Sequence, residues 1–474
     1  GRKREYTDRE KRKESETYME SKKLFAQTRP VKLFFIASIP GAISMLASAL
    51  YGLFDGIFVG QFLGSTAFAA VNLAMPFVII NFALSDLIGV GSSVPISISL
   101  GQKRDKDACN IFTCAVIMIV GTGILVGTAL FGFAPLFIRL MGAEGEFAEL
   151  AVMYLRVYAV FSPITTIVFA MDNFLRISGY IRYSMSLNVM MSVFCAGIEF
   201  LMLGVLGWNI WAAALSNCLG MTLCAAMALF PFLRGKTVLR FVRPRFHMAM
   251  IRQIIACGLP SFLNNIAGRI TSILLNAILV RLGGETAVSI YGALMYVDGF
   301  VQPVMYGACD SLQPAVGYNW GAGKFSRVRA LERCCFVAAA VICGAAVAVI
   351  SLFPSQLVHL FMSDAAGDIL ATADFAMRLF ALTYLTRWVA FATQSYMLAI
   401  EKPLQASIIS VSTALVFPLL LIAALWPLGL TGIWLNFAGT AALAAVLSIV
   451  ILVKARPLLN QPDQELPDTG EGTA

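Results

Sequence analysis

The sequence has few charged residues and almost no histidine for its length. Of its 474 residues, 13% are charged and two are histidine. Soluble domains have about 25% charged residues, so this composition excludes a water-soluble enzyme with an ordinary polar surface. The ten cysteines form no Cys-x-x-Cys pair and no Cys/His group with zinc-ligand spacing. A structural zinc site is therefore not expected.

Long apolar runs, by contrast, are abundant, and hydrophobic residues make up 59% of the chain. Crossing a bilayer takes roughly 17–25 apolar residues, and about twelve stretches reach that length. They are 33–60, 66–98, 110–138, 150–175, 184–206, 209–233, 254–282, 286–317, 335–362, 372–399, 404–427 and 430–455. We predict an all-α polytopic membrane protein with twelve transmembrane helices.

The basic residues gather in alternate connecting segments. Most of the 35 Lys and Arg residues lie in 1–32, 101–109, 234–252 and 321–333. By the positive-inside rule these segments and both termini face the cytoplasm, which predicts a multi-pass protein of a plasma membrane, of the bacterial inner-membrane type. The same distribution explains the net charge of +8 without nucleic acid, because acidic residues alternate with basic ones in the N-terminal tail.

The chain repeats itself at an offset near 220 residues. Pro40 pairs with Pro260 at this offset, and Gly101 pairs with Gly321. Each half holds six predicted spans, an even number, so the halves share one orientation as in transporters with two parallel lobes. We predict a charged tail at 1–32, six-helix lobes at 33–233 and 254–455, a basic linker at 234–253 and a tail at 456–474. Pro40 and Pro260 are expected to kink their helices.

Six acidic residues fall inside the predicted spans, where a carboxylate at the bilayer centre costs about 2.5–3.5 kcal/mol on insertion scales. They are Asp55, Asp86, Asp172, Glu199, Asp298 and Asp310. Each needs a partner, a proton or an ion. Asp172 has Arg176 one helical turn away, a spacing typical of an ion pair. In the second half, Arg269 or Arg387 could neutralise either acid of that half.

Asp55 and Glu199 lie deep in their spans. Asp55 is surrounded by glycines at every fourth position, and such a stripe lets another helix approach closely. At the repeat offset, Asp55 corresponds to Leu275, so the second half has no matching acid. A site built on Asp55 therefore belongs to the first half. Glu199 has no basic residue within one turn. A desolvated carboxyl pair can bind and release a proton, or hold Na⁺ with nearby oxygens.

Four segments carry a resemblance to a known family. They are IPGAISMLASALYGLFDGIFVGQFLGSTAFAAVNLAMP, GVGSSVPISISLGQKRDKDA, GLPSFLNNIAGRI and SLQPAVGYNWGAGKFSRVRAL. Together they resemble the multidrug and toxic compound extrusion (MATE) family over nearly all of residues 30–456. The resemblance implies twelve helices in two six-helix lobes. It also implies export of diverse, often cationic, drugs in exchange for H⁺ or Na⁺ by alternating access.

The resemblance also assigns roles to individual residues. The acid of the family's first helix matches Asp55. The fifth-helix motif is Asn, three intervening residues and then Asp; Cys195 and Glu199 stand at these two positions, and a sixth-helix hydroxyl matches Ser216. Cysteine in place of asparagine removes an oxygen ligand, which favours H⁺; if Na⁺ is the ion, Asp55 and Glu199 are its ligands. The predicted substrate-binding residues are Tyr51, Asn72, Met295, Asp298 and Gln302.

The expected partners are small cationic or amphipathic substrates and the surrounding lipids, with no nucleic acid, no cofactor beyond the coupling ion, and a monomeric chain. The alternative is a flippase or exporter for a lipid-linked saccharide or other solute of the same superfamily. A flippase for a lipid-linked saccharide needs a strongly cationic cavity to bind the pyrophosphate of its substrate. In this sequence the intramembrane acids equal or outnumber the arginines, which favours a cationic or neutral cargo. A membrane enzyme would need clustered metal-ligating residues within its spans. The two histidines, His247 and His359, lie at or outside the ends of the spans, which argues against an enzyme. We therefore predict a transporter.

Overall fold

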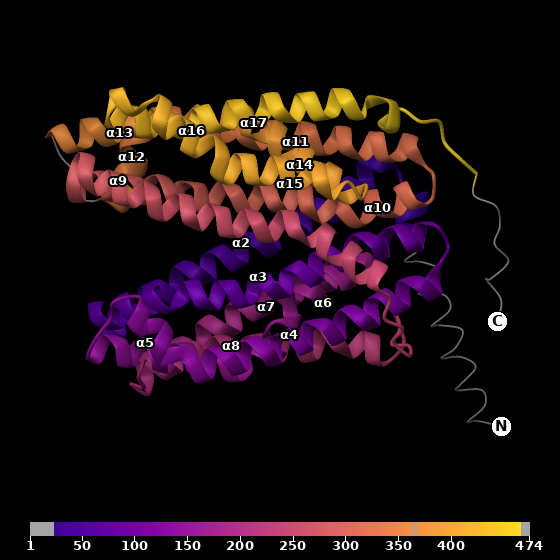
Figure 1. Ribbon diagram of the computed structural model, residues 1–474, viewed down its shortest axis with the longest axis horizontal. Coiled ribbons are helices and arrows are strands. Elements are labelled where there is room, and N and C mark those ends of the chain that lie inside the picture. Colours follow the sequence, from indigo (N-terminus) through magenta and orange to yellow (C-terminus); the bar gives the residue numbers. More distant parts are fainter. Residues whose placement is uncertain (1–22, 363–364, 366, 466–474) are drawn as a thin grey trace. The chain divides into compact units, whose positions relative to one another are not determined.

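The computed structural model describes residues 23–362, 365 and 367–465, and this part of the chain is helical without a β-strand (Figure 1). Residues 1–22 of the predicted N-terminal tail and 466–474 of the predicted C-terminal tail lie outside the described residues. The all-α prediction is confirmed. Long apolar helices suit a membrane because an α-helix satisfies its backbone hydrogen bonds internally.

The described residues fall into two compact units. Unit 1 contains 23–29 and 43–258, and unit 2 contains 30–42 and 259–465. The first helices are α2 (Pro30–Leu63), α3 (Ser65–Gly101), α4 (Asp105–Leu140), α5 (Glu146–Thr165), α6 (Ile167–Ile177), α7 (Ile181–Glu199), the π-helix η1 (Phe200–Val205) and α8 (Ile210–Leu233).

The second half of the chain has the same helical character. Its helices are α9 (Met248–Cys309), η2 (Asp310–Leu312), α10 (Gln313–Gly321), α11 (Phe325–Leu352), α12 (Pro354–Phe361), α13 (Gly367–Ala381), α14 (Tyr384–Ala399), α15 (Pro403–Val411), the π-helix η3 (Ser412–Val416), α16 (Phe417–Ala424), η4 (Trp426–Leu428) and α17 (Leu430–Leu459). The start of α2 belongs to unit 2, where the Ser38 hydroxyl donates to the Ala308 carbonyl at 3.0 Å.

Ten helices among the described residues are long and apolar enough to cross a bilayer, or eleven if the bent pair α13 and α14 forms one span. Twelve such stretches were expected. The remaining one, 286–317, starts where α9 is interrupted at Gly284, whose φ of 62° and ψ of −150° are not helical. That stretch includes Asp298, Gln302 and Asp310, so it is less apolar than the others.

Each unit has an extended segment docked on the first turns of a helix. In unit 1, residues 241–247 of the linker run beside α4, and the Arg245 N–H donates to Asn110 Oδ1 at 2.8 Å. In unit 2, the chain after α17 reaches the start of α11. There Asp463 accepts hydrogen bonds from the N–H and hydroxyl of Ser326 at 2.7 and 2.5 Å. These bonds lower the pKa of Asp463.

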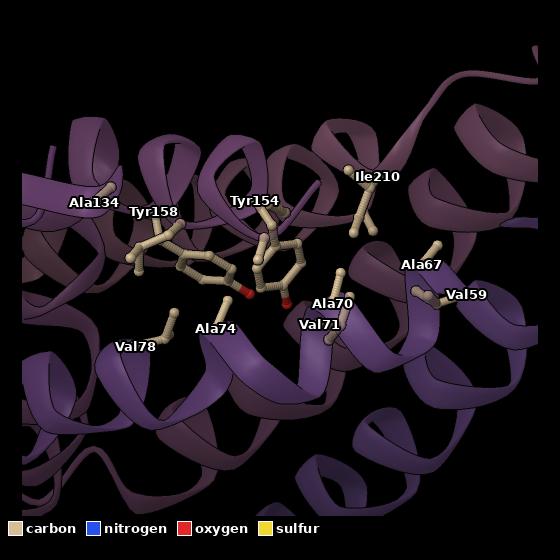
Figure 2. Packing of buried hydrophobic residues seen from close by; sticks show 14 of the residues in the cluster. Val59, Ala67, Ala70, Val71, Ala74, Val78, Ala134, Tyr154, Tyr158 and Ile210 are labelled. Carbon is tan, nitrogen blue, oxygen red and sulfur yellow. The ribbon is translucent and has the colours of Figure 1, made fainter. Parts of the chain in front are cut away.

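The core of unit 1 is built from small residues on α3 packed against aromatic residues on α5. Figure 2 shows the rings of Tyr154 and Tyr158 next to Ala70 and Ala74, and the two ring centroids lie 5.2 Å apart. Alanines allow the helix backbones to come close, as small residues do at helix interfaces in membranes. A buried tyrosine hydroxyl needs a polar partner, so this core leads directly to a polar site.

Candidate functional site

Two acidic side chains from separate helices meet inside unit 1. Asp55 lies on α2, one turn after Tyr51, and Glu199 is the last residue of α7. The carboxyl groups of Asp55 and Glu199 are side-chain hydrogen-bond partners. Glu199 is fully buried, and the hydroxyl of Tyr51 donates to its Oε2 at 3.4 Å. The predicted pair is therefore brought together by the fold.

The second oxygen of Glu199 has an unusual environment. Oε1 is buried, and no hydrogen-bond donor among the described residues reaches it. The neighbouring carboxyl of Asp55 can donate a hydrogen bond to Glu199 only when one of the two acids carries a proton. Two carboxylates at this distance repel one another, and burial makes that repulsion expensive. The arrangement therefore calls for a proton or another cation between the two acids.

The local backbone also departs from regular helix at this point. Glu199 is followed directly by η1, a π-helical stretch over Phe200–Val205. Such insertions are rare and occur frequently at functional sites, because they re-aim side chains and loosen backbone hydrogen bonding. The Phe200 ring packs against Phe58 and Phe62 of α2, with centroids 5.8 Å apart in both cases. This aromatic contact holds the end of α7 against the helix that carries Asp55.

Sequence reasoning missed an amide group beside the pair. Asn217 of α8 donates from Nδ2 to the Tyr158 hydroxyl at 2.5 Å, and its Oδ1 lies 3.8 Å from Cys195 Sγ. An amide of α8 therefore lies beside Cys195, the position where the resemblance implied an asparagine. Ser216, which was expected here, instead donates to the Ala213 carbonyl at 2.8 Å. Tyr154 and Tyr158 were also missed, although their spacing of four residues was a visible signal.

The predicted substrate residues are spread over both units. Tyr51 is half-buried beside Glu199, and Asn72 on α3 is exposed. Met295, Asp298 and Gln302 lie on α9 in unit 2. The structure therefore brings Tyr51 into the carboxyl site and leaves Asn72 outside it.

Unit 2 contains a cavity of about 200 Å³ next to an ion pair. Met295 and Asp298 line it, with aromatic and hydroxyl side chains from α9, α13, η3 and α17. Arg387 Nη1 donates to Asp298 Oδ1 at 2.6 Å, and the Tyr384 hydroxyl donates to the same oxygen at 2.6 Å. Arg387 also donates from Nη2 to Gln302 Oε1 at 3.3 Å. Of the neutralising pairs considered from sequence, the structure contains Asp298–Arg387.

A second group of charged residues lies in unit 1 near the turn between α6 and α7. Arg176 pairs with Asp172 at 2.9 Å, as its spacing indicated, and Arg176 is only 6% exposed. Asn188 donates to Asp172 Oδ1 at 2.7 Å, and the Ser184 hydroxyl donates to the same atom. Asp86 on α3 lies close enough to interact electrostatically with Asp172. This group holds two acids and one base.

One buried acid escaped the sequence analysis. Glu332 lies in α11 and is 5% exposed, with no hydrogen-bond partner for Oε2 among the described residues. The predicted span began after it, at 335, whereas α11 begins at Phe325. Across the described residues, no group of three or more His, Cys, Asp or Glu side chains could hold a metal ion.

Comparison with known proteins agrees with this architecture. The family model MatE matches residues 40–201 and 260–423, which is more than half of the chain. The multidrug export protein MepA of Staphylococcus aureus is 25% identical over 452 residues, covering 93% of this chain and 98% of that protein. MepA of Staphylococcus saprophyticus is also 25% identical, over 425 residues, covering 88% and 93% of the two chains.

Solved structures show the same fold. A crystal structure of MATE in complex with MaL6 superposes with a TM-score of 0.88 at 23% identity, covering 93% of this chain and 99% of that chain. An outward-facing multidrug resistance MATE family transporter of the MOP superfamily gives 0.87 at 23% identity, covering 93% and 98%. The fold and the apolar helices define a multi-pass membrane transporter. This chain belongs to the MATE family.

Proposed function

We propose that this chain is a secondary antiporter that exports small cationic or amphipathic compounds in exchange for H⁺. The observation that carries the proposal is the Asp55–Glu199 pair, two acids in contact with a buried oxygen that lacks a donor. A bound cation satisfies this pair, and its departure leaves two adjacent carboxylates. Cation binding and release at this point therefore changes the electrostatic energy of the whole first lobe.

A proton suits the pair better than Na⁺. A hard cation such as Na⁺ needs several oxygen ligands, whereas a proton needs only the two carboxyl groups. Position 195 contributes a thiol, a soft group, and the hydroxyl of Ser216 is engaged with its own helix. Asn217 is the nearby amide, and its Nδ2 is bound to Tyr158. If Na⁺ is the coupling ion, Asp55 and Glu199 would hold it, with Tyr51 as a further oxygen.

The cycle follows from the charge change at the pair. In the outward-facing form Asp55 and Glu199 take up the cation, the cargo leaves, and the lobes 33–233 and 254–455 rock to the inward-facing form. One charge crossing 100 mV supplies about 2.3 kcal/mol. A monovalent cationic cargo exchanged one for one gains nothing from the voltage. The ion gradient or a higher ion stoichiometry must then drive export.

The proposed cargo class rests on the intramembrane acids, which equal or outnumber the arginines and so favour a cationic cargo, and on the names of the relatives. Relatives of the chain are named multidrug export proteins. Tyr51, Asn72, Met295, Asp298 and Gln302 are our proposed cargo contacts, and Met295 and Asp298 line the unit 2 cavity.

We place the chain in a bacterial plasma membrane with both termini in the cytoplasm. One chain carries both the carboxyl pair and this cavity, so we propose that the monomer is the transport unit.

The test uses the full chain in proteoliposomes loaded with ethidium, a cationic dye, with pH and Na⁺ gradients imposed separately. We expect a pH gradient to drive ethidium movement, and Asp55→Asn and Glu199→Gln to abolish it. Glu144→Gln, a matched change at an exposed loop acid, should leave transport at the wild-type rate. Undiminished proton-driven transport by Asp55→Asn removes that residue from the mechanism. Transport driven only by Na⁺ assigns the pair to Na⁺ and rejects proton coupling.

A further inference from the structure

The buried face of α7 carries a continuous row of polar side chains. Its buried positions include Ser184, Asn188, Ser192, Cys195 and Glu199. Successive members are three or four residues apart, so they follow one another along the same side of the helix. A buried helix face in a membrane protein is normally apolar or made of small residues, because unpaired polar groups are costly there. This row therefore calls for a functional explanation.

The row joins the two charged groups of unit 1. Glu199 at one end contacts Asp55, and its Oε1 has no donor among the described residues. Ser184 and Asn188 at the other end both donate to Asp172, which pairs with Arg176. The first group contains two acids and no base, and the second contains two acids and one base. Each group can thus accept one proton without adding net positive charge.

The spacing of the row suits water rather than direct contact. Side chains four residues apart are separated by about 6 Å along the helix axis, twice the length of a hydrogen bond. A single water bridges such a gap, and hydroxyl and amide groups can each donate to it and accept from it. Opposite the middle of the row, the Cys195 sulfur packs directly against Gly220 of α8, so the thiol itself, and not a water, occupies this position. Asn217 and Cys224 of α8 flank this position.

Asp86 is the group best placed to receive a proton at the far end. Both oxygens of Asp172 are occupied, Oδ1 by Ser184 and Asn188 and Oδ2 by Arg176. Asp86 interacts electrostatically with Asp172 and forms no salt bridge within the described part of the chain. This end of unit 1 also carries the linker, since the Tyr180 hydroxyl donates to the Lys236 carbonyl at 3.1 Å. In the predicted topology it is the cytoplasmic end.

We propose that the buried face of α7 is the route by which the proton exchanged at Asp55 and Glu199 passes to Asp86, and from there to the cytoplasm. The O–H bond of the Glu199 carboxyl breaks, the Cys195 thiol accepts that proton and releases its own, water beside Ser192 and Asn188 carries it on, and a new O–H bond forms on the Asp86 carboxylate. No electrons are transferred. The proposal rests on proton-coupled export, the function proposed above.

The titratable and charged groups that face the far end come from three helices. They are Asp86 on α3, Asp172 and Arg176 on α6, and Cys224 on α8. Ser184 and Asn188 face it from α7. Because Arg176 and the side chains of α7 already occupy both oxygens of Asp172, Asp86 is the group whose protonation the route changes.

The experiment measures cargo-driven proton release in proteoliposomes of the full chain, with ethidium as cargo and pyranine reporting pH. We expect Asp86→Asn and Asn188→Leu to slow proton movement about 100-fold or more, while ethidium affinity stays at the wild-type value. Asn188→Ser keeps a polar group that can bind water and should retain most of the rate. Ser186→Ala, on the exposed side of the same helix, is the matched control.

The outcomes separate this proposal from the proposed function. If the wild type releases protons on ethidium transport and both variants match its rate, the α7 route is wrong while proton-coupled export stands. If Asn188→Leu and Asn188→Ser are equally slow, Asn188 acts through folding rather than through water, and the route is also rejected. If the wild type moves ethidium without any proton, both proposals fail together.

Discussion

The sulfur of Cys195 on α7 fills the space that a side chain on Gly220 of α8 would occupy. The two helices approach most closely here, one turn from Glu199. A thiol at position 195 and a glycine at position 220 are therefore a matched pair. The contact explains why α7 and α8 can bring Glu199 and Asn217 to the same site.

We predict that Gly220→Ala destabilises the protein by about 1–3 kcal/mol, because the added methyl overlaps the Cys195 thiol. Cys195→Ala in the same chain should recover part of that loss. Thermal unfolding in detergent measures both. Gly121→Ala is the control, since a Cβ there meets no atom within 4 Å. A Gly220→Ala protein as stable as Gly121→Ala would contradict the packing argument.

The Asp298–Arg387 pair in unit 2 leads to a second prediction. Arg387→Met leaves Asp298 with Tyr384 as its one remaining donor among the described residues, so it should destabilise unit 2 more than the double change Asp298→Asn with Arg387→Met. The side chain of Arg387 is 25% exposed and that of Asp298 is 14% exposed. The loss of stability should therefore be below the roughly 3–5 kcal/mol typical of a fully buried pair. A double-mutant cycle of melting temperatures measures the coupling. Additive effects would show that the pair contributes nothing specific.

The linker contact at α4 leads to a third prediction. Asn110 accepts from the Arg245 N–H at 2.8 Å and donates to the Arg245 carbonyl at 3.1 Å. Asn110→Leu removes both bonds, which are worth about 0.5–1.5 kcal/mol each, and Asn110→Asp keeps only the acceptor. We expect trypsin to cleave after Arg245 fastest in Asn110→Leu and at an intermediate rate in Asn110→Asp. Equal cleavage in all three proteins would mean that Asn110 does not hold the linker.

The C-terminal contact at α11 leads to a pH-dependent prediction. Hydrogen bonds from the hydroxyl and N–H of Ser326 lower the pKa of Asp463 below its ordinary value, near 3.9. The contact should therefore stabilise the segment after α17 above that value and be lost as pH falls through the lowered pKa. Pepsin digestion between about pH 4 and 2 should release 460–465 slowly at the upper end and faster below it. Asp463→Asn should be released fast throughout, and a constant ratio of the two rates would reject the prediction.

Much of the architecture could be predicted from composition alone. Apolar length located the spans, because a bilayer imposes the same requirement on every helix that crosses it. The same reasoning found Asp55 and Glu199, since an acid in an apolar run is visible without any structure. Apolar length is a weaker guide to the eighth predicted span, 286–317, because Asp298, Gln302 and Asp310 make the chain after Gly284 more polar than the other spans.

The identity of the groups around the acids needed the fold. Ser216 and Asn217 are neighbours in sequence, and adjacent residues on a helix point about 100° apart. Which of them faces Cys195 depends on how α8 is rotated, and that rotation is set by packing against α5 and α7. The pairing of Arg387 rather than Arg269 with Asp298 has the same origin, since Arg269 lies on an exposed part of α9.

The sequence by itself determined that this is a membrane protein, that its chain is duplicated, and that Asp55 and Glu199 are acids within apolar spans. The duplication is visible as matching residues at a fixed offset, and the other two conclusions follow from solvation, which acts on each residue through its own neighbours in the chain. The tertiary structure alone decided that the two acids meet, that Asn217 lies beside Cys195, and that one buried face of α7 carries polar side chains between Glu199 and the residues bound to Asp172. Such contacts join residues on different helices, and only the packing of those helices determines them.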